Sequence, residues 1–233
     1  MSTDRKTFMA RVSRALGNDR VPDQITPSYD YSQGRQYSRL QNLDAAALRE
    51  VMAAQAPVRD FTYYECNADE LPALLAEIIA KEAPNRVVVP ADTAADGIDL
   101  AALVATSGAE VYGYSKDADA ASQRATIESA DLGITIPFRA IADTGTTLEI
   151  ASDSCGKIVG LLPTAHISII FQSRMRATLT QLAPELDELG AAADGPSYFL
   201  FISGPSSTGD IESVLVTGVH GPTREYDIVV KDL

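Results

Sequence analysis

Apolar residues recur along most of the chain with spacings that alternate between helix and strand. Within residues 71–79, leucines and isoleucines fall at i, i+3, i+4, i+7 and i+8, which predicts an amphipathic helix. Asn67 and Glu70 precede this segment with the spacing of a capping box. Residues 87–89 form a continuous valine run that ends at Pro90, as expected of a buried strand. This alternation predicts a mostly parallel sheet with helices on both faces.

The same patterns predict the remaining elements of the body. Helices are expected over 45–55 (after Asp44 as N-cap), 98–106, 117–130 and 174–189. Strands are expected over 110–114, 134–136, 147–151, 158–162, 167–171, 198–202, 214–219 and 227–231. We therefore expect a three-layer α/β/α fold with one core and no internal repeat.

The first part of the chain has a different character. Phe8, Met9, Val12 and Leu16 recur at helical spacing, and Gly17 is placed to end that helix. Residues 18–42 are rich in Pro, Gln, Ser and Tyr, which fits either a loose linker or an arm lying across another surface. We divide the chain into an N-terminal helix, arm and helix (1–57) and an α/β domain (58–233).

Charge separates these parts further. The chain has a formal net charge of −13, but residues 1–43 hold seven basic and four acidic residues, a net of +3. The remainder holds 12 basic and 28 acidic residues, a net of −16. So acidic a body disfavours a nucleic-acid partner. The basic arm favours packing on its own body or on a sister subunit, which makes a homo-oligomer through the arm one expectation.

Composition narrows the remaining classes of function. Two cysteines are too few to ligate an iron–sulfur cluster or form a disulfide framework. No apolar run approaches the ~20 residues needed to cross a bilayer, and Phe8 and Met9 lie among charges, so we expect a cytoplasmic protein without a membrane span. Neither a phosphate-binding P-loop nor a dinucleotide fingerprint is present in the sequence. Cys155, beside Lys157, is expected to be a loop thiol, with a lowered pKa as the alternative.

Candidate chemistry gathers in three segments of the second half. In the first, Thr144, Gly145 and Thr146 form a turn whose hydroxyls and amides suit an anion, although an ordinary turn entering a strand has the same pattern. In the second, His166 follows Pro163 at the start of an apolar strand, as either a structural or a functional histidine.

The third segment, residues 203–222, is the densest. Ser207 and Asp210 match a capping box, which predicts a short helix whose free amides would hold a phosphate or carboxylate. The ligand-binding candidates here are Gly204, Ser206, Ser207, Thr208 and Gly221. Asp210, Glu212 and His220 are the candidates for acid/base catalysis. The two histidines and these acids lack tight ligand spacing, so we expect no metal site.

These three segments resemble the LUD-domain family, of the lactate-utilization protein C type. Residues 140–146 (AIADTGT) resemble its "aIAeTGT" segment, and Leu162, Pro163 and His166 resemble its "LP..H" step. Residues 203–212 with 218–222 resemble its "GPSrTaDIE…GvHGP" signature, and the whole resemblance covers about 61–233. The chain departs from that pattern at Asp143 (commonly Glu), Ser207 (Arg or Lys) and Gly209 (Ala).

The resemblance implies a fold like ribose-5-phosphate isomerase, glucosamine-6-phosphate deaminase and the CoA transferases. It also implies a non-redox subunit of an L-lactate to pyruvate oxidation system, without a cofactor of its own. Its partners would be iron–sulfur lactate-utilization proteins, and its ligand a small acid. In so acidic a body, that anion would need hydroxyls, backbone amides or a borrowed cation.

Two alternatives belong to other classes of function. One is a stand-alone enzyme acting on a phosphorylated sugar or a CoA ester, with Glu149 or Glu212 as nucleophile. An outward-facing Glu149, the ordinary expectation for a strand residue, would speak against it. The other alternative is a ligand-sensing module whose arm responds to occupancy of the pocket.

Overall fold

The computed structural model describes residues 4–17, 34, 38–93, 96–211, 214–218 and 220–233, and its contacts divide the chain into Met1–Ser38 and Arg39–Leu233. In the first unit, helix α1 (Arg5–Ala15) begins where the Asp4 side chain accepts a hydrogen bond from the backbone N–H of Thr7 (3.2 Å). Gly17 follows with a φ of +79°, so the predicted helix end is confirmed.

The second unit contains the other helices and strands whose bounds the structure gives. In chain order they are α3 (Ala45–Ala53), α4 (Ala56–Arg59), β1 (Thr62–Cys66), α5 (Leu71–Glu82), β2 (Arg86–Val89), α6 (Leu100–Ala105), β3 (Glu110–Gly113), α7 (Ala120–Glu128), β4 (Leu132–Thr135), β5 (Arg139–Ile141), η3 (Ala142–Thr144), β6 (Thr146–Ile150), α8 (Ile158–Leu161), β7 (Ala165–Phe171), η4 (Gln172–Arg174), β8 (Met175–Arg176), α9 (Leu179–Ala191), β9 (Phe199–Ile202), β10 (Ser207–Ile211), β11 (Val214–Thr217) and β12 (Arg224–Val230).

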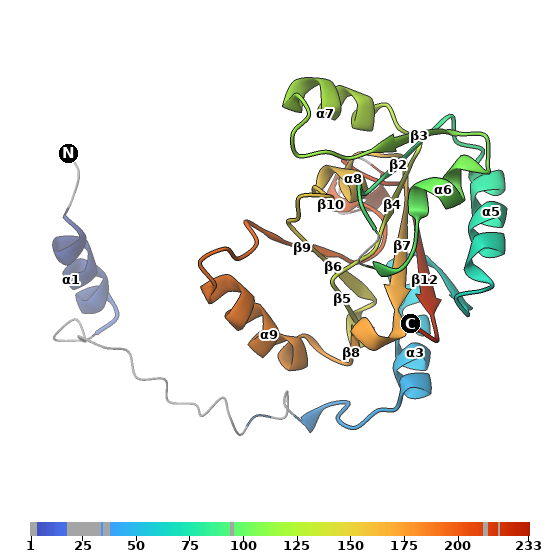
Figure 1. The fold of residues 1–233 in the computed structure, drawn as a ribbon. Coiled ribbons are helices and arrows are strands. Elements are labelled where there is room, and N and C mark those ends of the chain that lie inside the picture. The colour runs from blue at the N-terminus through green and yellow to red at the C-terminus, as the bar shows by residue number, and fades with distance from the viewer. Residues whose placement is uncertain (1–3, 18–33, 35–37, 94–95, 212–213, 219) are drawn as a thin grey trace. The chain divides into compact units, whose positions relative to one another are not determined.

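A six-stranded sheet forms the centre of this unit (Figure 1), with strand order β1-β12-β7-β4-β2-β3. Every pair in it is parallel, which confirms the predicted α/β class. Helices α5 and α6 cover one face, where their leucines and isoleucines meet alternate residues of the central strands. On the opposite face, α7 and α8 pack on β2 through Ile127, Val159 and Val88.

A second sheet of four strands, β8-β5-β6-β9, covers the rest of that opposite face. Helix α3 packs between the sheets, where Met52 meets Ala140 of β5 and Val229 of β12. Leu182 of α9 packs with Ile141 and Leu148 in a further cluster. The sequence patterns predicted a single core, and the second sheet was not foreseen. Strands were expected over 147–151 and 198–202, but their local spacing does not indicate which sheet they join. Residues 139–141 and 175–176 were not expected to be strands.

Two elements were predicted with the wrong type, and one helix was predicted to begin too early. Residues 158–162 form helix α8 instead of a strand, because a continuous apolar run carries no period that separates a buried helix from a buried strand. The segment after Ser207 forms strand β10 instead of a helix start, because Ser207 and Thr208 pair with Thr217 and Val216 of β11. The predicted helix over 174–189 begins only at Leu179, after Thr178 caps it.

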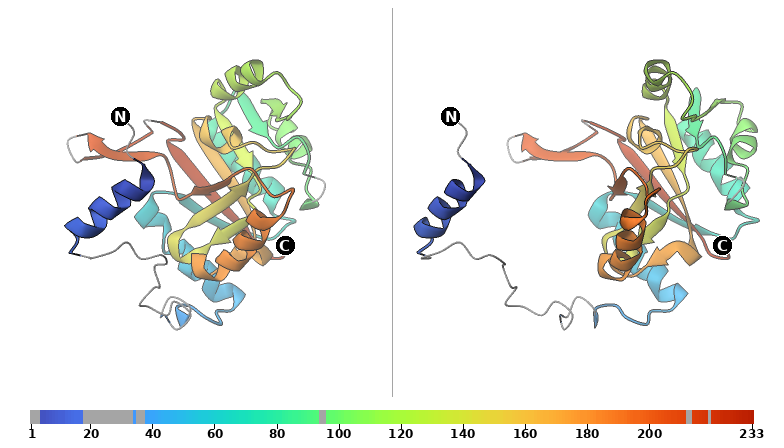
Figure 2. Two further views of the ribbon diagram at one scale, coloured as in Figure 1. Left: turned by 90° about the vertical axis from the view of Figure 1, so that its left-hand side faces the viewer. Right: turned by 60° about the vertical axis from the view of Figure 1, so that its left-hand side comes forward.

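Strands β10 and β11 form a separate antiparallel pair. Figure 2 shows this two-stranded ribbon, coloured orange to red, extending away from the two sheets in both views. Its base returns to the body where the Ser206 N–H donates to the carbonyl of Pro222 (2.9 Å).

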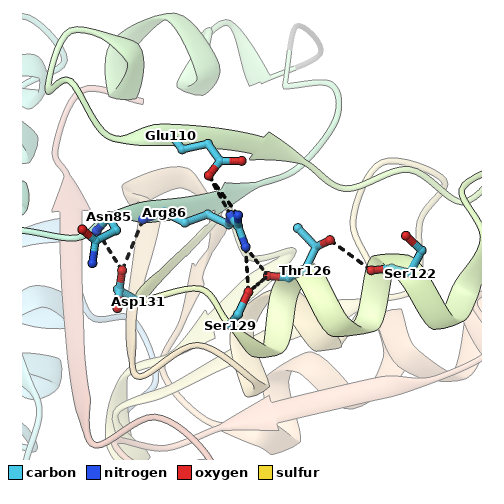
Figure 3. Close-up of polar contacts among 7 residues, drawn as sticks. All are labelled: Asn85, Arg86, Glu110, Ser122, Thr126, Ser129 and Asp131. Atoms are coloured by element: carbon cyan, nitrogen blue, oxygen red, sulfur yellow. Dashed lines mark hydrogen bonds and ion pairs between the residues drawn. The ribbon is translucent and has the colours of Figure 1, made fainter.

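A polar clamp holds the amino-terminal ends of β2, β3 and β4 together (Figure 3). The carboxylate of Asp131, just before β4, accepts the backbone N–H groups of Asn85 (2.7 Å) and Arg86 (3.2 Å). The Arg86 guanidinium donates to Glu110 of β3 (2.9 Å) and to the Ser129 hydroxyl at the end of α7 (2.6 Å). The clamp lies at the amino ends of the strands, where it fixes their register.

Replacing Asp131 tests the clamp. Asp131→Ala should lower the free energy of unfolding by about 1–3 kcal/mol, because it leaves two backbone donors without their acceptor. Urea unfolding checks this value. Glu128→Gln serves as the control, since its ion pair with Arg124 is long and exposed (3.9 Å) and should contribute below about 1 kcal/mol. Equal losses in both variants would contradict a structural role for the Asp131 carboxylate.

Candidate active site

A row of polar side chains lies buried on one face of the central strands. Side chains alternate along a strand, and the α5/α6 face takes Ile167 and Ile169 of β7 with Tyr226 and Ile228 of β12. The intervening residues therefore point to the opposite face, toward the second sheet. We call them the buried polar row: Thr135, His166, Ser168, Glu225 and Asp227.

Register brings these residues side by side. Glu225 of β12 pairs with His166 of β7, which pairs with Gly133 of β4. One step along, Asp227 pairs with Ser168, which pairs with Thr135. No member of the row is more than 2% exposed.

Hydrogen bonds join the row in series. The carboxylate of Glu225 lies 2.8 Å from Nδ1 of His166, and the Thr135 hydroxyl lies 2.9 Å from Nε2 of the same ring. The Thr135 hydroxyl also donates to Glu149 of β6 (2.6 Å), which faces the row from the second sheet. Ser168 donates a second hydrogen bond to Glu225 (3.3 Å). The series therefore runs from Glu225 through His166 and Thr135 to Glu149.

Burial dominates the electrostatics of these groups. It raises the pKa of Glu149, of Glu225 and of Asp227, and hydrogen bonds from Thr135 and His166 oppose the shift at the two glutamates. At His166 burial opposes the charged form, but the negative charge and hydrogen bond of Glu225 raise the pKa above its ordinary value. These groups hold protons more tightly in the folded chain than in water.

A cavity of about 280 Å³ opens beside the row, and Glu225 forms part of its wall. Ser203, Ser206, Ser207 and His220 supply its other polar side chains, and His220 is exposed. The cavity therefore presents a carboxyl group, several hydroxyls and an imidazole to a ligand.

Helix α8 lies directly over the row. A Cβ added to Gly133 would lie 2.1 Å from the Val159 carbonyl, so only glycine allows the helix this close. A Cβ added to Gly160 would already be 3.2 Å from Nε2 of His166. The short helix thus excludes solvent from the imidazole.

The predicted site residues divide into those at the cavity and those behind it. Gly204, Ser206, Ser207, His220 and Gly221 line the cavity. Thr144, Gly145, Thr146, His166 and Thr208 are not among its lining residues. Asp210 belongs to strand β10, and Glu212 lies outside the described residues.

The first segment supports the cavity from behind. The Thr146 hydroxyl lies 2.6 Å from that of Ser203, a lining residue, and 2.8 Å from that of Thr144. Gly145 has a φ of +56°, and a Cβ there would lie 2.7 Å from the Phe61 ring. This glycine is therefore required for packing of the turn.

Sequence reasoning missed Glu225, Asp227, Ser168 and Thr135. The sequence feature that could have identified them is a polar residue at every second position of an otherwise apolar strand, because such alternation gives the strand one polar face. The expectation of an outward-facing Glu149 was wrong, because this side chain is 7% exposed and faces the row. The lowered pKa considered for Cys155 was also wrong, since burial raises the pKa of that thiol.

The described part of the chain contains no group of three or more His, Cys, Asp or Glu residues arranged to hold a metal ion. Within the same residues, no helix has the length and apolarity required to span a membrane.

Comparison with known proteins gives a consistent result. The model of the LUD domain matches residues 49–230. A protein named lactate utilization protein C from Halalkalibacterium halodurans is 30% identical, with 98% of each chain covered, and one of the same name from Shouchella clausii is 30% identical over the whole of both chains. A third, from Bacillus subtilis, is 27% identical, covering 98% of this chain and 97% of the other. The crystal structure of a DUF162 family protein from Deinococcus radiodurans superposes with a TM-score of 0.57 at 23% identity, over 81% of this chain and 99% of the other, which supports the fold.

The raised pKa of Asp227 predicts how stability depends on pH. A carboxyl that binds its proton more tightly when folded stabilises the protein fully below the unfolded pKa of about 3.9. That stabilisation is lost as the pH rises through the higher folded pKa. Asp227→Asn should therefore reduce the fall in urea midpoint between about pH 5 and about pH 8, since among described residues Asp227 Oδ1 has no hydrogen-bond partner to lose.

The control for this measurement is Asp187→Asn, at an exposed position of α9. It should keep the wild-type slope. A slope in Asp227→Asn equal to that of the wild type would show that Asp227 does not hold a proton in the folded state.

Proposed function

Because the chain belongs to the LUD domain family, we propose that it is the non-redox component of an L-lactate to pyruvate oxidation system and binds a small carboxylate in the cavity beside Glu225. The names of its relatives support involvement in lactate utilisation. Its redox partners would carry the iron–sulfur clusters, and this chain would need no cofactor.

One observation carries the proposal: the third signature segment folds back on itself to form the cavity. Gly204 and Ser206 come from its start, and His220 and Gly221 from its end. A volume of about 280 Å³ lies just below the usual range for ligand pockets, as suits a small organic acid. The hydroxyls of Ser206 and Ser207 with the imidazole of His220 would bind the carboxylate and the C2 oxygen.

The acidity of the body does not oppose this proposal. Glu225 is paired with His166, and burial favours its protonated form. A protonated carboxyl carries no charge to repel an anion.

If the chain is instead an enzyme acting on a CoA ester, Glu225 is a better candidate for the nucleophile than Glu149 or Glu212. Its Oε2 atom is buried and lacks a hydrogen-bond partner within the described chain, and the residue forms part of the cavity wall, where a bound CoA ester would meet it. A phosphorylated sugar is less suited, because none of the described cavity residues is Lys or Arg.

Ligand binding tests the leading proposal. Isothermal titration of the full chain with L-lactate and with pyruvate should give saturable binding at one site. Ser206→Ala should weaken binding about 10-fold, as expected for one hydrogen bond to a charged group. Ser197→Ala is the matched control, because Ser197 lines a separate depression near α9. This variant should bind L-lactate as the wild type does. Absence of binding, or equal effects of the two variants, would contradict the proposed cavity.

Co-purification tests the partner. Tagged full-length protein expressed in its native cell should bring down an iron–sulfur protein after gentle lysis. Arg11→Glu with Arg14→Glu, both exposed on basic α1, should reduce the recovered partner several-fold, and added salt should do the same, if the arm docks electrostatically. Glu188→Gln on α9 is the control. Ligand binding without any such partner would instead favour the sensing module.

A further inference from the structure

We propose that the series from Glu225 through His166 and Thr135 to Glu149 is a reversible proton wire, which protonates Glu225 when an anion occupies the cavity. The identity of that anion rests on the function proposed above, whereas the wire itself rests on the hydrogen-bond geometry. The wire deepens the proposal by stating how a cavity walled by a carboxyl group admits an acid.

The hydrogen-bond valences allow the series to run in either direction. Thr135 has one hydroxyl hydrogen and contacts both Glu149 (2.6 Å) and Nε2 of His166 (2.9 Å). If it donates to Glu149, then Nε2 must carry a hydrogen and donate to Thr135. If Glu149 is protonated and donates instead, the Thr135 hydrogen points to a bare Nε2.

The second ring nitrogen transmits this choice to the cavity. With Nδ1 bare, its 2.8 Å contact with Glu225 requires a protonated Glu225. With a hydrogen on Nδ1, Glu225 is the ionised acceptor. One proton can thus leave Glu149 and arrive at Glu225 while the net charge of the wire stays at −1.

The surroundings decide which end is ionised in the absence of ligand. When ionised, Glu225 receives hydrogen bonds from both His166 and Ser168, whereas an ionised Glu149 receives one, from Thr135. We therefore place the charge on Glu225 and the hydrogen on Nδ1 in the free protein. Other titratable or charged groups nearby are Asp227, which interacts electrostatically with Glu225, and Arg174, whose positive charge acts on Glu149. His220 lines the same cavity as Glu225.

An anion in the cavity would reverse this order. Its charge lies next to Glu225 and farther from Glu149, so repulsion favours moving the ionised end to Glu149. The proton passes from Glu149 to Thr135, from Thr135 to Nε2, and from Nδ1 to Glu225. Glu225 is then uncharged, donates its hydrogen bond to the bare Nδ1, and no longer repels the anion. No proton is taken from solvent.

The tautomer of His166 tests the wire without any ligand. The chain has two histidines, so ¹⁵N-histidine NMR gives two sets of signals, and His220→Gln assigns them. Wild-type His166 should carry its hydrogen on Nδ1. Glu225→Gln imitates the protonated carboxyl by donating from its amide, and should move the hydrogen to Nε2. The same tautomer in both proteins would overturn the wire, whether or not lactate binds.

Proton uptake on binding provides the second measurement. Titration with L-lactate in buffers of different ionisation enthalpy should show no net proton uptake by the wild type, because the proton moves internally. The Glu149→Gln variant has no proton at position 149 to pass along the wire. It should therefore take up about one proton from the buffer on binding L-lactate. Thr135→Val should behave in the same way, and adding Glu149→Gln to it should change nothing further.

Glu188→Gln, an exposed carboxyl on α9, is the control and should match the wild type. A Glu149→Gln variant that binds L-lactate without proton uptake would overturn the wire while leaving the proposed function intact. Failure of the wild type to bind L-lactate or pyruvate, together with the expected tautomer change, would overturn the proposed function alone.

Discussion

The common register of β12, β7 and β4 is the constraint on which the site depends. Because side chains alternate across a sheet, a slip of one residue would move Glu225 and His166 into the apolar layer beneath α5 and α6. In the observed register they face the second sheet instead, where Glu149 completes the hydrogen-bonded series through Thr135. The second sheet therefore serves to satisfy polar groups that the central strands bury, as well as to cover apolar area.

Burial of that series depends on a second feature, the close approach of α8. Gly133 lets the Val159 carbonyl lie against β4, and Gly160 lets the helix lie against the His166 ring. A larger residue at either position would lift the helix and admit water to the imidazole. Solvent exclusion strengthens each hydrogen bond in the series and penalises any unpaired charge, so the protons must be distributed to satisfy every member.

Local sequence patterns predict strands β2, β3, β4, β7 and β12 as short apolar runs, and the helices α3 and α5 from their period and caps, at Asp44 and at Asn67 with Glu70. Strand β1 was not predicted. The patterns do not predict which strands lie at the centre. Strand β12 is last in the chain yet lies between β1 and β7, so Glu225 resembles an ordinary exposed residue until that non-local pairing is known. Glu149 was misplaced for the same reason. The cavity residues after Ser203 were predictable from their sequence signature, although the hairpin that holds them was not.

The opposition between an acidic body and an acidic ligand follows from counting every carboxyl as ionised. The formal charge of −13 includes Glu149, Glu225 and Asp227, whose burial favours the protonated forms. Around the cavity, the position of protons within the buried series sets the charge that a ligand meets. When protonated, this carboxyl carries no charge to repel an anion, and when ionised it is an acceptor for a hydroxyl. Moving one proton within the series therefore lets the same wall admit an anion such as a 2-hydroxy acid, without a Lys or Arg among the described cavity residues.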